Sequence, residues 1–107
     1  MFTRVIEMKA KSGRSSDLAD ILEKKILPSL ARKAGFLGQT VLASETDPDS
    51  ILTFSFWRTR EDAEHYERSH NARTNEILSA LLSGDPLVRS FTVYTSTLHR
   101  VSFGKSA

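Results

Sequence analysis

The chain has 107 residues, of which 39% are hydrophobic and 26% are charged, a composition typical of one soluble globular domain. It contains no cysteine, which excludes disulfides and thiolate metal ligands, and its net charge of +2 is too small to indicate nucleic-acid binding. No apolar run is long enough to cross a bilayer and no signal-peptide pattern opens the chain, so we expect a cytoplasmic protein without a membrane partner.

The first predicted elements are a strand and a long helix. Residues 2–9 alternate weakly between apolar and polar side chains, which predicts a strand. After a serine-rich turn, apolar residues recur every three or four positions, which predicts a helix over residues 16–33. Pro28 lies inside this helix and should kink it, because proline has no backbone N–H to donate. Gly35 is expected to end the helix.

A β-hairpin and a second helix are predicted next. Residues 38–45 and 51–57 form the two strands, and residues 46–50 between them have the composition of a turn. Thr59 is a good N-cap residue, and Asp62 stands three positions later, which is the spacing of a capping box.

The second helix is predicted to run over residues 60–82, with its apolar positions on one face. Residues 69–71 are Ser, His and Asn, which favour caps over helix interiors and could interrupt it. Residues 83–86 should end the helix, and residues 88–98 are predicted to form the last strand.

The predicted order β-α-β-β-α-β indicates an α+β, ferredoxin-like fold, with a four-stranded antiparallel sheet and two helices on one face. We expect this domain over residues 1–100 and a C-terminal tail over residues 101–107. Both faces of the last two predicted strands carry large apolar side chains, although the helices cover only one face. This pattern favours a homodimer with the sheets face to face, and the alternative is a monomer with a mixed outer face.

Several short motifs occur together along residues 2–98. They are Leu27-Pro28, the start of the second strand at Gly35–Gly38, the turn Asp47–Asp49, the segment Phe56–Ala63, and His70. In these motifs the chain resembles the antibiotic biosynthesis monooxygenase family, within the dimeric α/β-barrel superfamily. The resemblance implies a dimeric barrel whose ligand cavity lies between each sheet and its own helices. Relatives include cofactor-free oxygenases, haem-degrading enzymes and members without an assigned reaction, so it leaves the activity open.

The resemblance also implies a role for the aromatic residues of the third strand. Trp57 would line the ligand cavity. Phe54 and Phe56 are further candidate substrate-binding residues. The alternative is that Trp57 is a core or interface aromatic. The polyketide oxygenases of the family pair this tryptophan with an asparagine, and residues 53–56 contain none.

The candidate catalytic residues are His70, Tyr66 and Glu7. Tyr66 and His70 lie four positions apart and share a helix face. A histidine there could take a proton from a phenolic or enolic substrate, and the tyrosine could donate a hydrogen bond to the resulting oxyanion. Asn71 is a polar substrate contact or a cap. Glu7 would be a further base if it faced inward, and an edge position is the alternative.

Two functions stay open after these assignments. The first is a cofactor-independent monooxygenase, an oxidoreductase that acts on an aromatic or quinol-like small molecule. The alternative is a non-catalytic binding or accessory protein of the same fold. An RNA-recognition module shares the order of elements, but residues 51–57 lack the basic-glycine opening that it needs. No metal site is expected, because His65 and His70 are five apart and fall on different helix faces.

Overall fold

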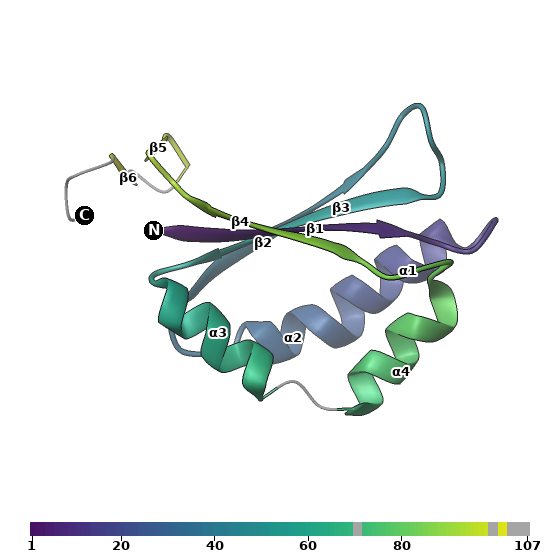
Figure 1. Cartoon of the computed structure of the whole chain (residues 1–107), viewed down its shortest axis with the longest axis horizontal. Coiled ribbons are helices and arrows are strands. Elements are labelled where there is room, and N and C mark those ends of the chain that lie inside the picture. Colours follow the sequence, from purple (N-terminus) through teal and green to yellow (C-terminus); the bar gives the residue numbers. More distant parts are fainter. Residues whose placement is uncertain (70–71, 99–100, 103–107) are drawn as a thin grey trace.

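One antiparallel sheet is covered on a single face by helices (Figure 1), in a computed structural model that describes residues 1–69, 72–98 and 101–102. In chain order the elements are β1 (Phe2–Lys9), α1 (Ser15–Ile21), the π-helical segment η1 (Leu22–Ile26), α2 (Leu27–Leu30), β2 (Phe36–Ala43), β3 (Ser50–Trp57), α3 (Arg60–Arg68), α4 (Ala72–Leu81), β4 (Leu87–Thr92), β5 (Thr95–Ser96) and β6 (Val101–Ser102). The main sheet has the order β2-β3-β1-β4. The predicted α+β, ferredoxin-like arrangement is confirmed, with each predicted helix divided.

The first helical stretch runs from α1 through η1 into α2 without leaving helical backbone angles. Its π-helical turn ends just before Pro28, where the sequence predicts a kink. The N–H of Leu27 reaches back five residues to the carbonyl of Leu22, as in a π-helix. The proline therefore coincides with a locally widened turn.

The second helix begins as predicted and is divided in two at residues 69–71, where the sequence indicated a possible interruption. Thr59 is the N-cap of α3, and its Oγ1 accepts a hydrogen bond from the backbone N–H of Asp62 at 3.1 Å. α3 ends at Arg68 and α4 begins at Ala72. The candidate residues His70 and Asn71 fall between the two helices and lie outside the described residues.

The last predicted strand is too long. β4 ends at Thr92, which pairs with Phe2, the first residue of its partner strand β1. One more bond joins the N–H of Val93 to the carbonyl of Met1, and beyond it β1 offers no further partner. The chain then forms a separate two-stranded sheet in which Thr95–Ser96 pairs with Val101–Ser102. The first two residues of the expected tail therefore belong to a hairpin.

Side chains of each strand alternate between the helices and the opposite face, which we call the outer face. In β3, the positions that face the helices are buried, and those between them are partly exposed. The register places Leu52 opposite Leu42 and Glu7 on the outer face, and Glu7 opposite Leu87. The apolar side chains of this face are Val5, Leu42, Leu52, Phe54, Phe56, Leu87 and Phe91. The predicted abundance of apolar side chains on the uncovered face is confirmed.

Candidate functional site

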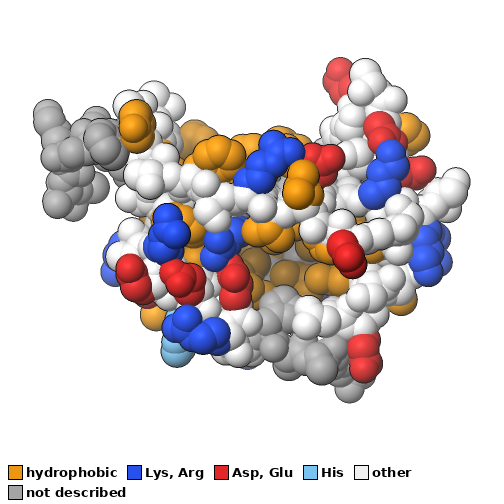
Figure 2. Space-filling model, in the orientation of Figure 1, with side chains coloured by type: hydrophobic (Ala, Val, Ile, Leu, Met, Phe, Trp, Pro, Cys, Tyr) orange, Lys and Arg blue, Asp and Glu red, His pale blue; other side chains and the backbone are white. Residues whose placement is uncertain are grey.

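A cavity of about 280 Å³ lies between the sheet and the helices that cover it. Figure 2 shows a hollow on this side of the molecule, with hydrophobic side chains in its depth. The volume falls just below the roughly 300–1,000 Å³ typical of drug-sized ligand sites, so the cavity suits a small molecule. Its lining residues are Arg4, Ile6, Met8, Leu22, Ile26, Leu30, Gln39, Thr53, Ser55, Tyr66, Glu67, Asn75, Leu78, Pro86 and Val88.

The floor of the cavity is the helix-covered face of the sheet. β1 contributes Arg4, Ile6 and Met8 because every second side chain of a strand points to the same face. β3 contributes Thr53 and Ser55 by the same alternation. The opposite wall comes from η1, where the widened turn lies directly over the cavity, and from α3 and α4.

Arg4 is the one positively charged side chain among the described residues that line the cavity, and only 15% of it is exposed. Its guanidinium forms an ion pair with Glu67 of α3 through Nη2 and donates a hydrogen bond to the Ser90 hydroxyl of β4 through Nη1. Its Nε is buried and has no hydrogen-bond acceptor among the described residues. Arg4 therefore brings a largely buried positive charge to the site.

Tyr66 lines the same cavity from α3, as the sequence predicts for a helix face that points at the sheet. Its ring centroid lies 5.6 Å from that of Trp57. Burial raises the pKa of the Tyr66 hydroxyl above its ordinary value, because an apolar environment disfavours the phenolate. The hydroxyl therefore stays protonated at neutral pH and can act as a hydrogen-bond donor.

Trp57 is not among the residues that line this cavity, which agrees with the alternative of a core aromatic. The side chain is 1% exposed and packs in the core, with Phe36 edge-on to its ring at 5.4 Å. Its Nε1–H donates a hydrogen bond to the Ser55 hydroxyl at 3.0 Å. Trp57 thus stands behind the site and contacts Ser55 and Tyr66, which do line it.

Three other candidates lie on the outer face, away from the cavity. Phe54 and Phe56 alternate with the buried positions of β3 and therefore point away from the helices. Glu7 is exposed, and its carboxylate lies 3.7 Å from the guanidinium of Arg89. Glu7 is not the inward base that the sequence left open, because Arg4 takes the inward register of β1.

The sequence-based assignment missed Arg4, Ser55 and Glu67 as cavity residues. Arg4 shares its parity with Ile6 and Met8, and this is the signal in the sequence that could have placed it inward. Glu67 follows Tyr66 in α3 and lies at the rim, with 51% of its side chain exposed. Asn75 of α4 completes the polar groups that the helices bring to the cavity.

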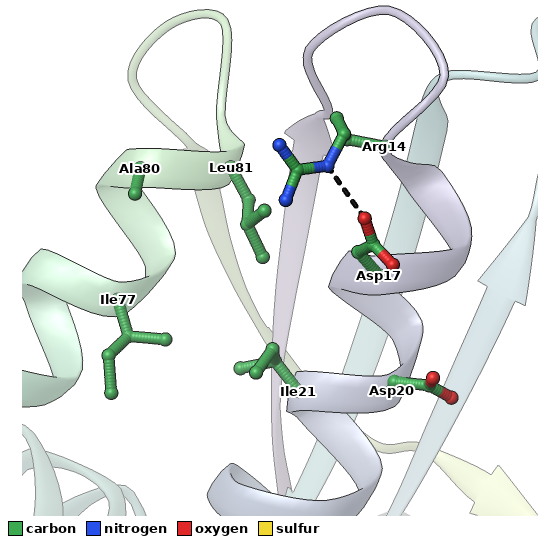
Figure 3. A pocket seen from close by; sticks show the side chains of 7 residues that line it. All are labelled: Arg14, Asp17, Asp20, Ile21, Ile77, Ala80 and Leu81. Atoms are coloured by element: carbon green, nitrogen blue, oxygen red, sulfur yellow. Dashed lines mark hydrogen bonds and ion pairs between the residues drawn. The ribbon is translucent and has the colours of Figure 1, made fainter.

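A second concavity of about 540 Å³ lies between α1 and α4 (Figure 3). Ile21, Ile77 and Leu81 form its apolar part, and at its edge the Arg14 Nε–H donates to the Asp17 carboxylate at 2.6 Å. Because these two charges pair with each other and both side chains are about half exposed, this groove is a weaker candidate for a specific ligand than the Arg4 cavity.

The described residues give no sign of two other kinds of site. No group of three or more His, Asp or Glu side chains lies close enough to hold a metal ion within the described part of the chain. None of its described helices is long and apolar enough to span a membrane.

The chain matches one protein-family model and a number of solved structures. The model of the family described as antibiotic biosynthesis monooxygenase matches residues 1–75. No curated protein matches the chain by sequence.

Several solved structures share the fold at low sequence identity. SnoaB, a cofactor-independent oxygenase from Streptomyces nogalater, is 16% identical with a TM-score of 0.73, over 90% of this chain and 95% of its own. The monooxygenase from the gene ActVA-Orf6 of Streptomyces coelicolor, solved with the ligand nanaomycin D, is 22% identical with a TM-score of 0.74, over 89% and 88%. A protein of unknown function from Nitrosomonas europaea is 20% identical with a TM-score of 0.75, over 90% and 91%. These likenesses establish the fold.

Proposed function

Because the chain belongs to the antibiotic biosynthesis monooxygenase family, we propose that it is a cofactor-independent monooxygenase acting on a small aromatic or quinol-like molecule. The observation that carries this proposal is the mainly apolar cavity into which a few polar groups converge from separate elements. Arg4 comes from β1, Ser55 from β3 and Tyr66 from α3. Apolar walls with a small number of placed polar groups are typical of sites for small organic ligands.

In the proposed reaction, a base removes a proton from the substrate and leaves an electron-rich carbanion conjugated with an oxyanion. The Tyr66 hydroxyl donates a hydrogen bond to that oxyanion, and its raised pKa keeps the proton in place at neutral pH. The carbanion transfers electrons to O₂, a carbon–oxygen bond forms, and loss of water from the resulting peroxide leaves a carbonyl. One O₂ is consumed per substrate, and one of its oxygen atoms leaves as water.

We assign the base to His70, which follows Tyr66 by four positions in the sequence and lies outside the described residues. Glu7 has no part in this reaction, because it lies on the outer face. Trp57 supports the site from behind, through its hydrogen bond to Ser55 and its packing against Tyr66.

Oxygen consumption tests this function with a panel of anthrones, quinols and haem. We expect uptake by the wild-type protein, reduced about a hundredfold by Tyr66→Phe and by His70→Ala. His65→Ala is the matched control, because His65 is exposed on α3 and should leave the rate unchanged. Full activity in both site variants would refute the assigned roles, and no uptake by the folded wild-type protein would refute the oxygenase.

A second candidate function is a small-molecule-binding or accessory protein of the same fold. It is favoured by the state of Glu67, the one carboxylate among the described cavity residues, which is already paired with Arg4. No described side chain in the cavity is therefore placed as an unpaired carboxylate base. Ligand binding without any oxygen uptake would support this alternative.

We propose further that two copies of the chain associate through their outer faces. The helices leave this face of the sheet uncovered (Figure 1), and Leu42, Leu87 and Phe91 on it are 44%, 51% and 48% exposed. Apolar side chains gathered on one uncovered face are typical of an interface. A two-fold axis would bring the same residues of both copies together.

A further inference from the structure

We propose that the cavity binds its ligand as an anion, with the Arg4 guanidinium as the counter-ion of an oxyanion that is a phenolate, an enolate or a carboxylate. This inference concerns the same cavity as the proposed function and rests on it for the substrate's aromatic part. Beyond the proposed function, the ligand would carry a negative charge, and Arg4 would be the residue that recognises that charge.

The first support is the position of Arg4 in the sheet. β1 lies between β3 and β4, so Arg4 has Ser55 directly opposite on one side and Ser90 on the other. Residues directly opposite one another in adjacent strands point to the same face. The guanidinium is therefore flanked by two hydroxyl-bearing residues on the helix-covered face.

The second support is the number of donors that Arg4 carries. A guanidinium has five N–H groups in a fixed planar fork, which matches carboxylates and other oxyanions. One Nη group binds Ser90 and the other binds Glu67, while the buried Nε has no acceptor among the described residues. Each Nη carries two N–H groups, so an oxygen of the ligand could accept from one that Ser90 and Glu67 leave, and a charge-assisted hydrogen bond of this kind is stronger than a neutral one.

The third support is the imbalance of burial within the Arg4–Glu67 pair. The arginine side chain is 15% exposed, whereas that of the glutamate is 51% exposed and lies at the rim. Water screens the exposed carboxylate more than the buried guanidinium. No other Lys, Arg, Asp or Glu is found among the described residues that line the cavity, so positive potential dominates there.

A consequence for chemistry follows from this potential. A cation within a few ångströms lowers the pKa of a bound acidic hydroxyl, because it favours the charged form. The apolar part of the ligand would pack against the cavity's aliphatic side chains, such as Ile6 and Leu78. Arg4 would thus favour the deprotonated form of the bound hydroxyl, and the proposed base would remove the proton from carbon.

A purely structural role for the same residues makes different predictions. If the Arg4–Glu67 pair only fastened α3 to the sheet, removing either partner would weaken ligand binding alike. If Arg4 is the counter-ion, Arg4→Gln should weaken the binding of anions, and Glu67→Gln should strengthen it by removing a competing carboxylate. Opposite signs for the two variants separate the two roles.

The experiment uses para-nitrophenol, para-nitrobenzoate and the neutral ether para-nitroanisole, titrated into the full chain by calorimetry. The absorbance of the phenolate reports the pKa of bound para-nitrophenol. We expect the wild-type protein to prefer the anions and to lower that pKa. Arg4→Gln should lose about ten- to hundredfold in affinity for the anions and little for the ether. Arg4→Lys keeps the charge and should therefore retain part of the affinity for the anions. This variant tests the inference if Arg4→Gln fails to fold.

The outcomes distinguish this inference from the proposed function. Equal binding of ether and anions, parallel losses in Arg4→Gln and Glu67→Gln, or no binding of any probe would overturn the inference. Oxygen uptake could persist in each of those cases. Arg4-dependent binding of an anion without oxygen uptake by the wild-type protein would instead support the inference and refute the oxygenase. Whichever anion binds more tightly identifies the ligand's oxygen as a phenolate or a carboxylate.

Discussion

At the scale of single residues, the direction in which each side chain points decides whether it belongs to the site. Arg4 and Glu7 both lie on β1, three positions apart, so one faces the helices and the other faces away. Trp57 ends β3 on the helix-covered face, but its large ring is fully used in packing with Phe36 and Tyr66. The polar side chains that can contact a ligand are therefore others, among them Arg4, Ser55 and Tyr66.

Gly35 is a residue-scale feature that ties the site's helix to the sheet. Its φ is +79°, in the left-handed region, and a Cβ there would lie 2.7 Å from the Cβ of Asp62. Gly13 also has a left-handed φ, of +76°, but a Cβ there would meet nothing within 4 Å. The two glycines form a matched pair in which only one has a steric neighbour.

We predict that Gly35→Ala destabilises the fold more than Gly13→Ala does. Gly13→Ala should cost about 1–2 kcal/mol for the left-handed backbone alone. Gly35→Ala should cost at least about 1 kcal/mol more, because turning the Asp62 carboxylate away cannot move its Cβ. Urea unfolding of both variants measures the difference. Equal losses would show that the start of α3 shifts freely.

At the scale of elements, the first helical stretch is shaped by the spacing of its apolar residues. Its buried leucines and isoleucine recur every fourth position, at Leu18, Leu22, Ile26 and Leu30. In a regular α-helix of 3.6 residues per turn, a four-residue step advances the buried face by about 40°. A wider π-helical turn reduces this drift, so η1 keeps Leu22, Ile26 and Leu30 over the cavity.

We predict that Pro28→Ala makes the protein more stable and its site worse. Proline inside a helix costs about 3 kcal/mol, of which about 1 kcal/mol is offset in the unfolded chain, so the gain should be about 2 kcal/mol. Relaxation of η1 to an α-helical turn would rotate Leu22 and Ile26 relative to the cavity. The affinity for para-nitrophenol should then fall severalfold.

Urea unfolding and calorimetric titration check both parts of this prediction. Ser29→Ala is the control, because Ser29 is exposed beside Pro28 and its replacement adds no backbone N–H to the helix. A loss of both stability and affinity in Pro28→Ala would mean that the proline supports the widened turn.

At the scale of the whole molecule, the main fact is that the sheet has helices on one side only (Figure 1). The cavity lies on the covered side and the exposed apolar side chains lie on the other. The proposed ligand site and the proposed dimer interface therefore use opposite faces of the same strands. β1 carries Arg4 on one face and Glu7 on the other.

We predict that Phe91→Lys converts a dimer into a folded monomer. Phe91 is 48% exposed on the outer face, where a second copy would bury the new charge without a partner. Val41→Lys is the matched control, because Val41 is 39% exposed but shares its face with Thr53 on the helix-covered side. Light scattering gives the mass of each variant. A wild-type monomer, or a dimer unchanged by Phe91→Lys, would contradict the interface.

Much of the fold could be predicted from local signals, since these act between neighbouring residues. Alternating apolar residues predicted the strands of the main sheet, and apolar residues at spacings of three and four predicted the helices. Thr59 with Asp62 marked the start of α3. The end of β4 could not be placed this way. It is set by where its partner β1 begins, at Phe2, and strand pairing is a long-range contact.

The site depended on the tertiary structure for a similar reason. Alternation along β1 shows that Arg4 and Glu7 face opposite ways, but only the position of the helices decides which of them faces the cavity. Trp57 points from the sheet toward the helices and Tyr66 points from α3 toward the sheet. Packing decided that the larger ring fills the core while the tyrosine reaches the cavity. The sequence by itself determined the order of the elements and the parity of each side chain. The packed structure decided which side chains remain for a ligand.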